Sequence, residues 1–289
     1  MPVVVRGLML VVLLALGGCT SLLFYPEPGL PITPERAGIA YKDVALQAAD
    51  GTRLHAWWLP VPDGTPVKGT VLYLHGNGGN LAWHLGGTYW LPEQGYQVLM
   101  LDYRGYGLSE GAPSLPAVYQ DIEVAVQWLV DRDPARETPM LLLAQSLGGA
   151  LAVRYLRDHP QTPFDAVVLD GTPASFQGVA RHLLAGAWLT WPLQWPLSWV
   201  VSDRFSAIDA VAGLPLRPLL IFHSRDDQVV PFTNGLQLYR AAQVPRRFIV
   251  TSGVHVHTFN DARWRQALLE FFAHPQAFVA QVPRLNSAD

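Results

Sequence analysis

The sequence predicts an α/β fold, in which helices cover both faces of a mostly parallel sheet and antiparallel strands form its N-terminal edge. Short apolar runs alternate with helical patterns from residue 70 onward, and this alternation is typical of βαβ units. The runs are almost continuously apolar, as strands buried on both faces must be. Two earlier runs are joined by a hairpin signal, which predicts the antiparallel edge.

Each element can be placed on the chain. The hairpin joins residues 39–47 to residues 54–59 through Asp50-Gly51, a dipeptide that favours a tight turn. The parallel strands are expected at residues 71–74, 98–101, 140–143, 166–169, 219–222 and 248–250. Helices are expected in the gaps at residues 117–132, 147–158, 234–242 and 261–272.

The composition is that of a globular protein with one large core. Of the 289 residues, 50% are hydrophobic and 15% are charged. An α/β sheet of about 250 residues commonly forms without splitting, so we expect a single domain after processing. The formal net charge of −3 provides no basic footprint, so no nucleic-acid partner is expected.

Ser146 is the candidate nucleophile. It lies between an apolar run and a helical pattern, in the segment Leu143-Ala144-Gln145-Ser146-Leu147-Gly148-Gly149. A serine hydroxyl is a weak nucleophile, and a tight strand-to-helix turn lifts it toward an activating base. The turn crowds the positions two before and two after the serine. Gly148 fits there, whereas Ala144 stands where glycine is usual. The pattern indicates a nucleophile elbow, although small residues at such a junction also serve packing.

Asp227 is the candidate acid. It follows an apolar strand at residues 218–223, and open α/β sheets carry functional residues at the carboxyl ends of their strands. A carboxylate there can hold an imidazole in one tautomer and stabilise its protonated form. Asp227 is preferred to Asp226 because it opens the segment that ends at Pro231. Asp226 is interpreted as a solvated or turn-capping side chain.

The base is expected in the loop that follows the last apolar strand. Two histidines stand there, His255 and His257, and His255 is preferred because Gly253 can turn the chain toward the site. His257 is the alternative. A metal site built on the His-x-His pair is a further alternative, but no third ligand stands at a recognisable spacing, so no metal is expected.

Acyl transfer also needs preorganised donors for the oxygen that becomes negative. We expect this oxyanion hole to consist of the backbone N–H groups of Leu147 and Asn77. Asn77 lies in a Gly-rich segment after the strand at residues 70–74, and glycine lets the backbone approach a ligand closely. A phosphate-binding loop is the alternative, but neither the G-x-G-x-x-G spacing nor a closing Lys-Ser/Thr is present. His75 is interpreted as a structural residue that fixes this loop.

Four segments together resemble the signatures of the α/β-hydrolase superfamily, in particular of its lysophospholipase-like and acyl-thioesterase-like branch. They are His-Gly-Asn-Gly-Gly-Asn at residues 75–80, Asp-Tyr-Arg-Gly-Tyr-Gly-Leu-Ser-Glu-Gly at 102–111, Ala-Gln-Ser-Leu-Gly-Gly at 144–149 and Asp-Gln-Val-Val-Pro at 227–231. The resemblance covers roughly residues 40–273 and implies a serine hydrolase of esters or thioesters with no cofactor. The order Ser146, Asp227, His255 is also that of the superfamily.

Three positions depart from that pattern. They are Ala144 at the elbow, Ser224 after the strand histidine and Val254 before the base. None removes a catalytic group, but Val254, where glycine is frequent, leaves the choice between His255 and His257 open.

The first residues resemble a lipoprotein signal peptide. Residues 1–18 contain one cation, Arg6, and an apolar run at residues 8–16 that is too short to span a bilayer comfortably. The ending Leu16-Gly17-Gly18-Cys19 resembles a bacterial lipobox, which implies that Cys19, the only cysteine, is lipidated. Thr20 then resembles the signal for sorting to the outer membrane. We therefore expect a lipid-anchored protein of the bacterial cell envelope, facing the periplasm.

The other boundaries follow from composition. Residues 19–38 are rich in proline and predict an extended tether behind the lipidated cysteine. The hydrolase domain is expected at residues 39–275 and a C-terminal tail at residues 276–289.

A Trp-rich insertion at about residues 171–214 interrupts the βα rhythm and is the expected lid. Its tryptophans recur at spacings of three and four, at Trp188, Trp191, Trp195 and Trp199. They either pack into a core of the lid's own or form an apolar wall beside substrate or lipid. Pro192 and Pro196 break any single helix through this segment.

The leading hypothesis is a serine hydrolase of an acyl ester or thioester. In it His255 deprotonates Ser146, Asp227 orients the base, and water later releases the acyl group. The first alternative is a non-catalytic envelope lipoprotein that binds lipid or protein in the same cleft. The second is a serine peptidase of the same fold.

Overall fold

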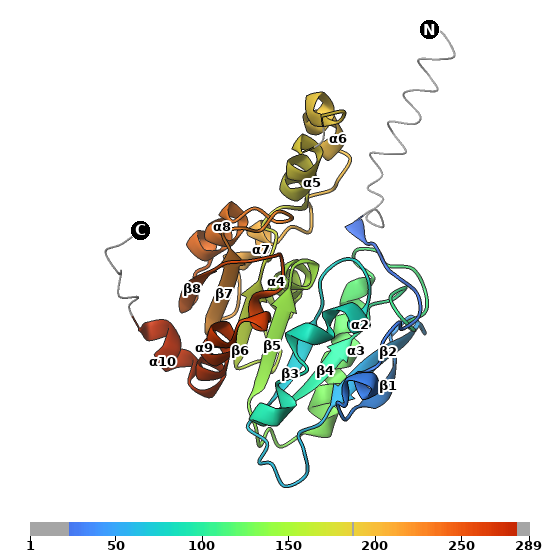
Figure 1. The fold of residues 1–289 in the computed structure, drawn as a ribbon, viewed down its shortest axis with the longest axis vertical. Coiled ribbons are helices and arrows are strands. Elements are labelled where there is room, and N and C mark those ends of the chain that lie inside the picture. Colours follow the sequence, from blue (N-terminus) through green and yellow to red (C-terminus); the bar gives the residue numbers. More distant parts are fainter. Residues whose placement is uncertain (1–22, 187, 282–289) are drawn as a thin grey trace.

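The computed structural model describes residues 23–186 and 188–281 (Figure 1). Eight strands form one sheet, in the order β1-β2-β4-β3-β5-β6-β7-β8. They are β1 (Lys42–Gln47), β2 (Arg53–Leu59), β3 (Gly69–Leu74), β4 (Tyr96–Leu101), β5 (Met140–Gln145), β6 (Ala166–Asp170), β7 (Leu219–Ser224) and β8 (Arg246–Thr251). Each strand overlaps a run expected from the sequence.

The predicted antiparallel edge is confirmed. β1 pairs antiparallel with β2, and β2 pairs antiparallel with β4, whereas the remaining pairs are parallel. The turn between β1 and β2 is closed by a 3.0 Å hydrogen bond from Thr52 N–H to Asp50 Oδ1. Gly51 has a φ of 87°, a conformation that glycine adopts without steric cost.

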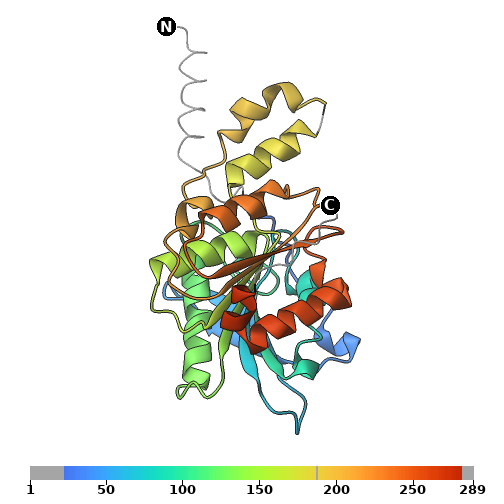
Figure 2. The same ribbon diagram turned by 90° about the vertical axis from the view of Figure 1, so that its left-hand side faces the viewer.

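Helices cover both faces of the sheet (Figures 1 and 2). The longer ones are α3 (Val118–Arg132), α4 (Leu147–Asp158), α5 (Phe176–Ala185), α8 (Thr233–Ala241), α9 (Ala262–Ala273) and α10 (Pro275–Ala280). The short ones are η2 (Pro34–Ala37), α2 (Leu81–His84), η3 (Leu85–Gly87), η4 (Pro92–Gln94), η5 (Trp191–Leu193), α6 (Gln194–Ser198), α7 (Ile208–Val211) and η6 (Thr258–Asn260).

Two apolar clusters, one on each face, form the core. Leu72 of β3 belongs to the cluster under α3, α4 and α8, while its neighbour Val71 belongs to the cluster under α9 and α10. Successive side chains of a strand point to opposite faces, so a strand covered on both sides must be apolar throughout. All six residues of β3 are buried accordingly.

The fold extends beyond residue 275, where the sequence predicted the start of a tail. Residues 275–280 form α10, and Phe278 is buried with its ring 5.7 Å from that of Phe271. The guanidinium of Arg247 lies 4.3 Å from the centre of the Phe278 ring. Burial of one aromatic side chain is worth about 1.5–3 kcal/mol, so this helix belongs to the domain.

Part of the Pro-rich segment before β1 lies against the domain, where the sequence predicted an extended tether. Residues 23–29, which we call the N-terminal strap, run along two loops of the domain. The strap makes isolated bridges from Pro26 to Gly79 and from Pro28 to Gly107. The N–H groups of Glu27 and Gly29 donate to those loops, at 3.0 and 2.8 Å. The prolines lack an N–H, so they occupy the alternate positions that need no partner. The predicted signal peptide and Cys19 lie outside the described residues.

The lid projects from the body of the molecule (Figure 2). It consists of α5, η5 and α6, and it is shorter than predicted because α7 packs against α4 and α8 in the body. All four lid tryptophans are exposed: Trp188 by 87%, Trp191 by 60%, Trp195 by 55% and Trp199 by 64%. These tryptophans therefore do not pack into a core of the lid's own.

Within residues 23–186 and 188–281, no helix has the length and apolar character needed to cross a membrane.

Candidate active site

Ser146 occupies the sharp turn between β5 and α4. Its φ of 51° and ψ of −119° lie in a region that residues other than glycine rarely adopt, so the elbow is strained. A Cβ at position 148 would lie 2.6 Å from the carbonyl oxygen of His75, so only glycine fits there, as predicted. The N–H of Ser146 donates to the carbonyl oxygen of Asp170 at 2.8 Å, which fixes the turn against β6.

The three predicted triad residues meet at the carboxyl ends of β5, β7 and β8. His255 Nε2 lies 2.9 Å from Ser146 Oγ, and His255 Nδ1 lies 2.6 Å from Asp227 Oδ2. Both distances are within hydrogen-bonding range. Imidazole Nδ1 therefore donates to the carboxylate, which leaves Nε2 to accept a proton from the serine.

Asp227 is held in place by the backbone. Its Oδ1 accepts hydrogen bonds from the N–H groups of Val229 and Val230, at 2.9 and 2.8 Å, so Oδ2 is left for His255. Burial alone would raise the pKa of Asp227, but the hydrogen bonds from His255 and from these N–H groups hold it below the usual value. The carboxylate is therefore ionised at neutral pH.

The structure assigns the competing residues to other tasks. Asp226 Oδ2 accepts a 3.0 Å hydrogen bond from Gly253 N–H, which ties its loop to the loop that carries His255. The side chain of His257 is exposed. The backbone N–H of His257 donates to the carbonyl oxygen of Val254. In the described part of the chain, no group of three or more His, Cys, Asp and Glu side chains could hold a metal ion.

The two expected oxyanion donors belong to segments that adjoin the serine. Leu147 is the first residue of α4, where a backbone N–H has no partner within the helix. Asn77 follows Gly76, and a Cβ built on Gly76 would lie 3.2 Å from the Cβ of Ser146. The Gly-rich loop thus passes directly against the elbow.

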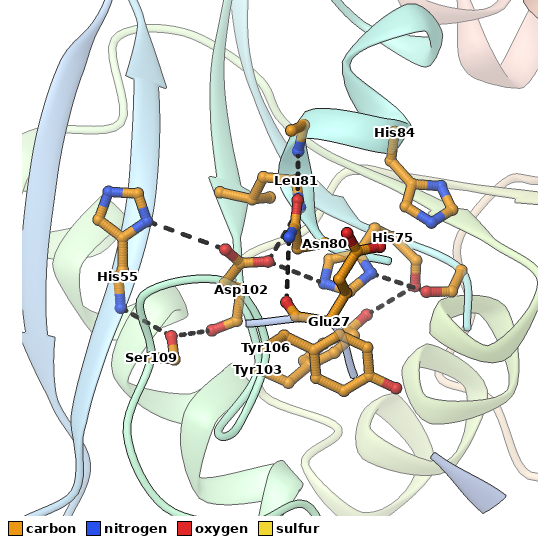
Figure 3. Close-up of polar contacts among 12 residues, drawn as sticks. Glu27, His55, His75, Asn80, Leu81, His84, Asp102, Tyr103, Tyr106 and Ser109 are labelled. Carbon is orange, nitrogen blue, oxygen red and sulfur yellow. Dashed lines mark hydrogen bonds and ion pairs between the residues drawn. The ribbon is translucent and has the colours of Figure 1, made fainter. Parts of the chain in front are cut away.

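His75 fixes this loop, as interpreted from the sequence (Figure 3). It is fully buried, and its Nδ1 lies 2.7 Å from the carbonyl oxygen of Gly76. Tyr103 OH donates to the carbonyl of His75 at 3.1 Å. His75 Nε2 lies 3.4 Å from Asp102 Oδ1, which also accepts from Leu81 N–H at 3.0 Å. Asp102 thereby ties the Gly-rich loop to α2.

His84, the last residue of α2, also contacts this loop, and the sequence did not reveal it. Its ring stacks on that of His75 with centroids 5.2 Å apart, and its Nε2 lies 3.1 Å from the carbonyl oxygen of Gly78. Burial and the neighbouring His75 lower the pKa of His84 to about 3. His84 is therefore neutral at pH 7 and donates to Gly78 without adding a charge beside the serine.

A buried polar network behind the serine was also missed. Gln145 precedes the nucleophile, and its Nε2 donates to Asp170 Oδ2 at 2.7 Å, while its Oε1 accepts from Tyr73 OH. Asp170 Oδ1 accepts from Thr258 Oγ1 at 2.7 Å. Burial raises the pKa of Asp170 to about 6. The partners come from β3, β6 and η6, far from Gln145 in sequence.

The sheet order and the residues at its strand ends define the class of an α/β hydrolase. A family model described as "Serine aminopeptidase, S33" matches residues 65–209. The chain therefore belongs to the α/β-hydrolase superfamily, as its signature segments predicted, and this membership supports a hydrolase function.

Known proteins are similar over most of the chain. "Uncharacterized protein YfhR" of Escherichia coli strain K12 is 30% identical over 236 residues, which are 80% of this chain and 80% of that protein. The α/β-hydrolase domain-containing protein WAV2 of Arabidopsis thaliana is 32% identical over 270 residues, 86% of this chain and 85% of that protein. The Pyrococcus furiosus esterase Pf2001 has a similar fold, with a TM-score of 0.69, 24% identity, and coverage of 86% of this chain and 97% of that one.

Proposed function

We propose that the protein is a serine hydrolase that cleaves carboxylic ester or thioester bonds through an acyl-enzyme intermediate. The observation that carries the proposal is the pair of contacts of His255, at 2.6 Å to Asp227 and 2.9 Å to Ser146. A nucleophile, a base and an orienting acid in hydrogen-bond contact are the features that recur in this chemistry.

The reaction would begin when Ser146 Oγ attacks the substrate carbonyl and His255 Nε2 takes the hydroxyl proton. Ionised Asp227 stabilises the imidazolium that forms, because its charge faces Nδ1. The N–H groups of Leu147 and Asn77 receive the oxyanion, and one such donor is worth about 3–4 kcal/mol. The tetrahedral intermediate then expels the alcohol or thiol, which takes the proton from Nε2. Water repeats the sequence on the acyl-enzyme and releases the acid.

Two other functions make different predictions. A peptidase would share the acylation step, and the description of the matching family model favours it. The structural similarity to the esterase Pf2001 favours an ester substrate instead. A protein that only binds lipid at this site would not need Ser146 in its strained conformation, since strain of this kind is typical of functional sites.

We also propose that the protein is anchored to a membrane through lipidated Cys19, with the lid turned toward the lipid. From Thr172 to Ser202 the chain contains one charged residue, Arg181, and no carboxylate. Arg181 itself stacks on the ring of Trp195, 3.9 Å from its centre. Exposed tryptophans with few charges suit the interface between lipid and water. Incorporation of labelled palmitate that is lost in Cys19→Ala would test the anchor; incorporation that persists in the variant would contradict it.

A fluorophosphonate probe tests the proposed chemistry, because it modifies only an activated serine. The wild type should be labelled and Ser146→Ala should not. Ser252→Ala, which changes an exposed serine of the loop that carries His255, should be labelled like the wild type. Release of acid from p-nitrophenyl esters of graded chain length, beside a panel of aminoacyl and peptide substrates, separates esterase from peptidase. A folded wild type that is neither labelled nor active would overturn the proposal.

A further inference from the structure

The side chain of Asn77 makes four hydrogen bonds, two of them with the N-terminal strap. Its Oδ1 accepts from Tyr25 N–H at 2.9 Å, from Tyr106 OH at 2.8 Å and from Gly78 N–H at 3.0 Å. Its Nδ2 donates to the carbonyl oxygen of Leu23 at 2.7 Å. Both ends of the amide therefore bind main-chain groups of a segment more than fifty residues away.

The strap holds the rest of the Gly-rich loop in the same way (Figure 3). Asn80 Nδ2 donates to the carbonyl oxygens of Glu27 and Gly29, at 3.0 and 2.7 Å. Glu27 N–H donates to the carbonyl of Gly79 at 3.0 Å, and Glu27 Oε2 accepts from Trp83 Nε1 at 2.9 Å. The strap therefore contacts the loop at each of its two asparagines.

The strap is also anchored by burial. Phe24 is only 5% exposed and belongs to the same apolar cluster as Tyr106 and Leu147. Burying its ring is worth about 1.5–3 kcal/mol, which is enough to keep a short extended segment docked.

The loop needs such support because of its glycines. Gly78 and Gly79 have φ values of 80° and 75°, and glycine loses more conformational freedom on ordering than any other residue. A side chain that makes four hydrogen bonds fixes its own backbone. The position of the Asn77 N–H is therefore set largely by the strap and by Tyr106.

We propose that residues 23–29 are a positioning element of the active site. The strap holds the Asn77 N–H at the place where the oxyanion forms. Residues 23–29 thereby contribute to catalysis without touching the substrate. This inference rests on the proposed hydrolase function. A displacement of about 1 Å in a catalytic group can cost about a hundredfold in rate, so loosening the strap should lower kcat while KM changes little.

One pair of variants of the full chain isolates the hydrogen bond from the strap. Tyr25→Pro removes the N–H that binds Asn77 Oδ1, whereas Tyr25→Ala keeps the N–H and removes only a ring that is 68% exposed. We expect Tyr25→Pro to lower kcat on a soluble p-nitrophenyl ester, and the rate of fluorophosphonate labelling, by about tenfold to a hundredfold. Tyr25→Ala should match the wild type in both.

Thermal unfolding, followed in parallel, separates positioning from mere stabilisation. A strap that only stabilises the fold would lower the melting temperature of Tyr25→Pro and leave kcat per folded molecule unchanged, and that result would overturn the inference. If Tyr25→Pro does not fold, Phe24→Ala removes the buried ring that docks the strap and should lower kcat in the same sense; an unchanged kcat there would overturn the inference. A wild type without turnover would instead refute the proposed function.

Discussion

The carbonyl oxygen of Val256 accepts a 3.2 Å hydrogen bond from the side-chain amide of Gln145, although 111 positions separate the two residues. Gln145 directly precedes Ser146, and Val256 directly follows His255. Val256 has a φ of 53°, which is unfavourable for a β-branched residue. The amide of Gln145 therefore holds the loop that carries His255, in a strained conformation, against the strand that ends at Ser146.

Replacing Gln145 should loosen this connection. In Gln145→Met the side chain keeps its length but loses its bonds to Val256, Asp170 and Tyr73. We expect the free energy of unfolding to fall by about 1–3 kcal/mol, because buried polar groups lose their partners. We expect kcat to fall at least about tenfold, because His255 is no longer held at the serine. Denaturant titration and ester kinetics measure the two effects.

The matched control is Gln228→Met, which changes an exposed glutamine beside Asp227. It should leave both quantities close to the wild type. A Gln145→Met variant that is destabilised but has the kcat of the wild type would contradict the positioning role.

The two neighbouring histidines should differ sharply on substitution. His255 Nε2 lies 2.9 Å from Ser146 Oγ, whereas the His257 side chain is exposed. We expect His255→Ala to lower kcat on a soluble ester by about a thousandfold or more, since loss of the base removes activation of the serine. His257→Ala should retain most of the activity. Loss of turnover in His257→Ala with retention in His255→Ala would reverse the assignment.

Asp170 should make the stability of the protein depend on pH. Burial raises its pKa from 3.8 to about 6, so the folded state binds a proton more tightly than the unfolded chain does. Its contribution to stability is therefore complete below about pH 4 and is lost as pH rises through about 6. The rise of the pKa of Asp170 from 3.8 to about 6 corresponds to about 3 kcal/mol of stability.

The variant Asp170→Asn isolates this group, because it cannot titrate. The free energy of unfolding of the wild type, relative to that of Asp170→Asn, should fall by about 3 kcal/mol between pH 4 and pH 7. Asp63→Asn, at an exposed position, is the control for the other titrating groups. A difference between wild type and Asp170→Asn that is the same at every pH would refute this prediction.

The sheet and the meeting of Ser146, Asp227 and His255 could be predicted because local patterns indicate them. A strand buried on both faces must be an apolar run, and a sharp elbow leaves room only for residues as small as Gly148. The helix α10 also had a local signal, since Pro275 stands at its first position, where the missing N–H is not needed.

The strap and the network of Gln145 could not be predicted in the same way. Their partners are set by the fold: Tyr25 finds Asn77, and Gln145 finds Asp170 and Val256, each far away in sequence. The alternation of prolines at positions 26 and 28 was the one local sign that the strap is extended with its N–H groups on one side. Proline-rich composition alone favoured a tether, because it says nothing of what the intervening N–H groups contact.

The lid tryptophans should matter for substrates held in lipid and not for soluble ones. Trp188 and Trp199 are 87 and 64% exposed, and we propose that the lid lies at the lipid interface. In the full chain reconstituted on phosphatidylcholine vesicles, the double variant Trp188→Ser/Trp199→Ser should hydrolyse a vesicle-borne long-chain ester about tenfold more slowly, since loss of roughly 1.4 kcal/mol of binding changes occupancy tenfold. Turnover of a soluble short-chain ester should stay within about twofold of the wild type, and quenching of tryptophan fluorescence by brominated phosphatidylcholine should decrease. Leu216→Ser, at an apolar position of the body that is 80% exposed, should change neither rate. If the variant hydrolyses both substrates at the wild-type rates, or if both rates fall together, the lid does not act as a contact with lipid.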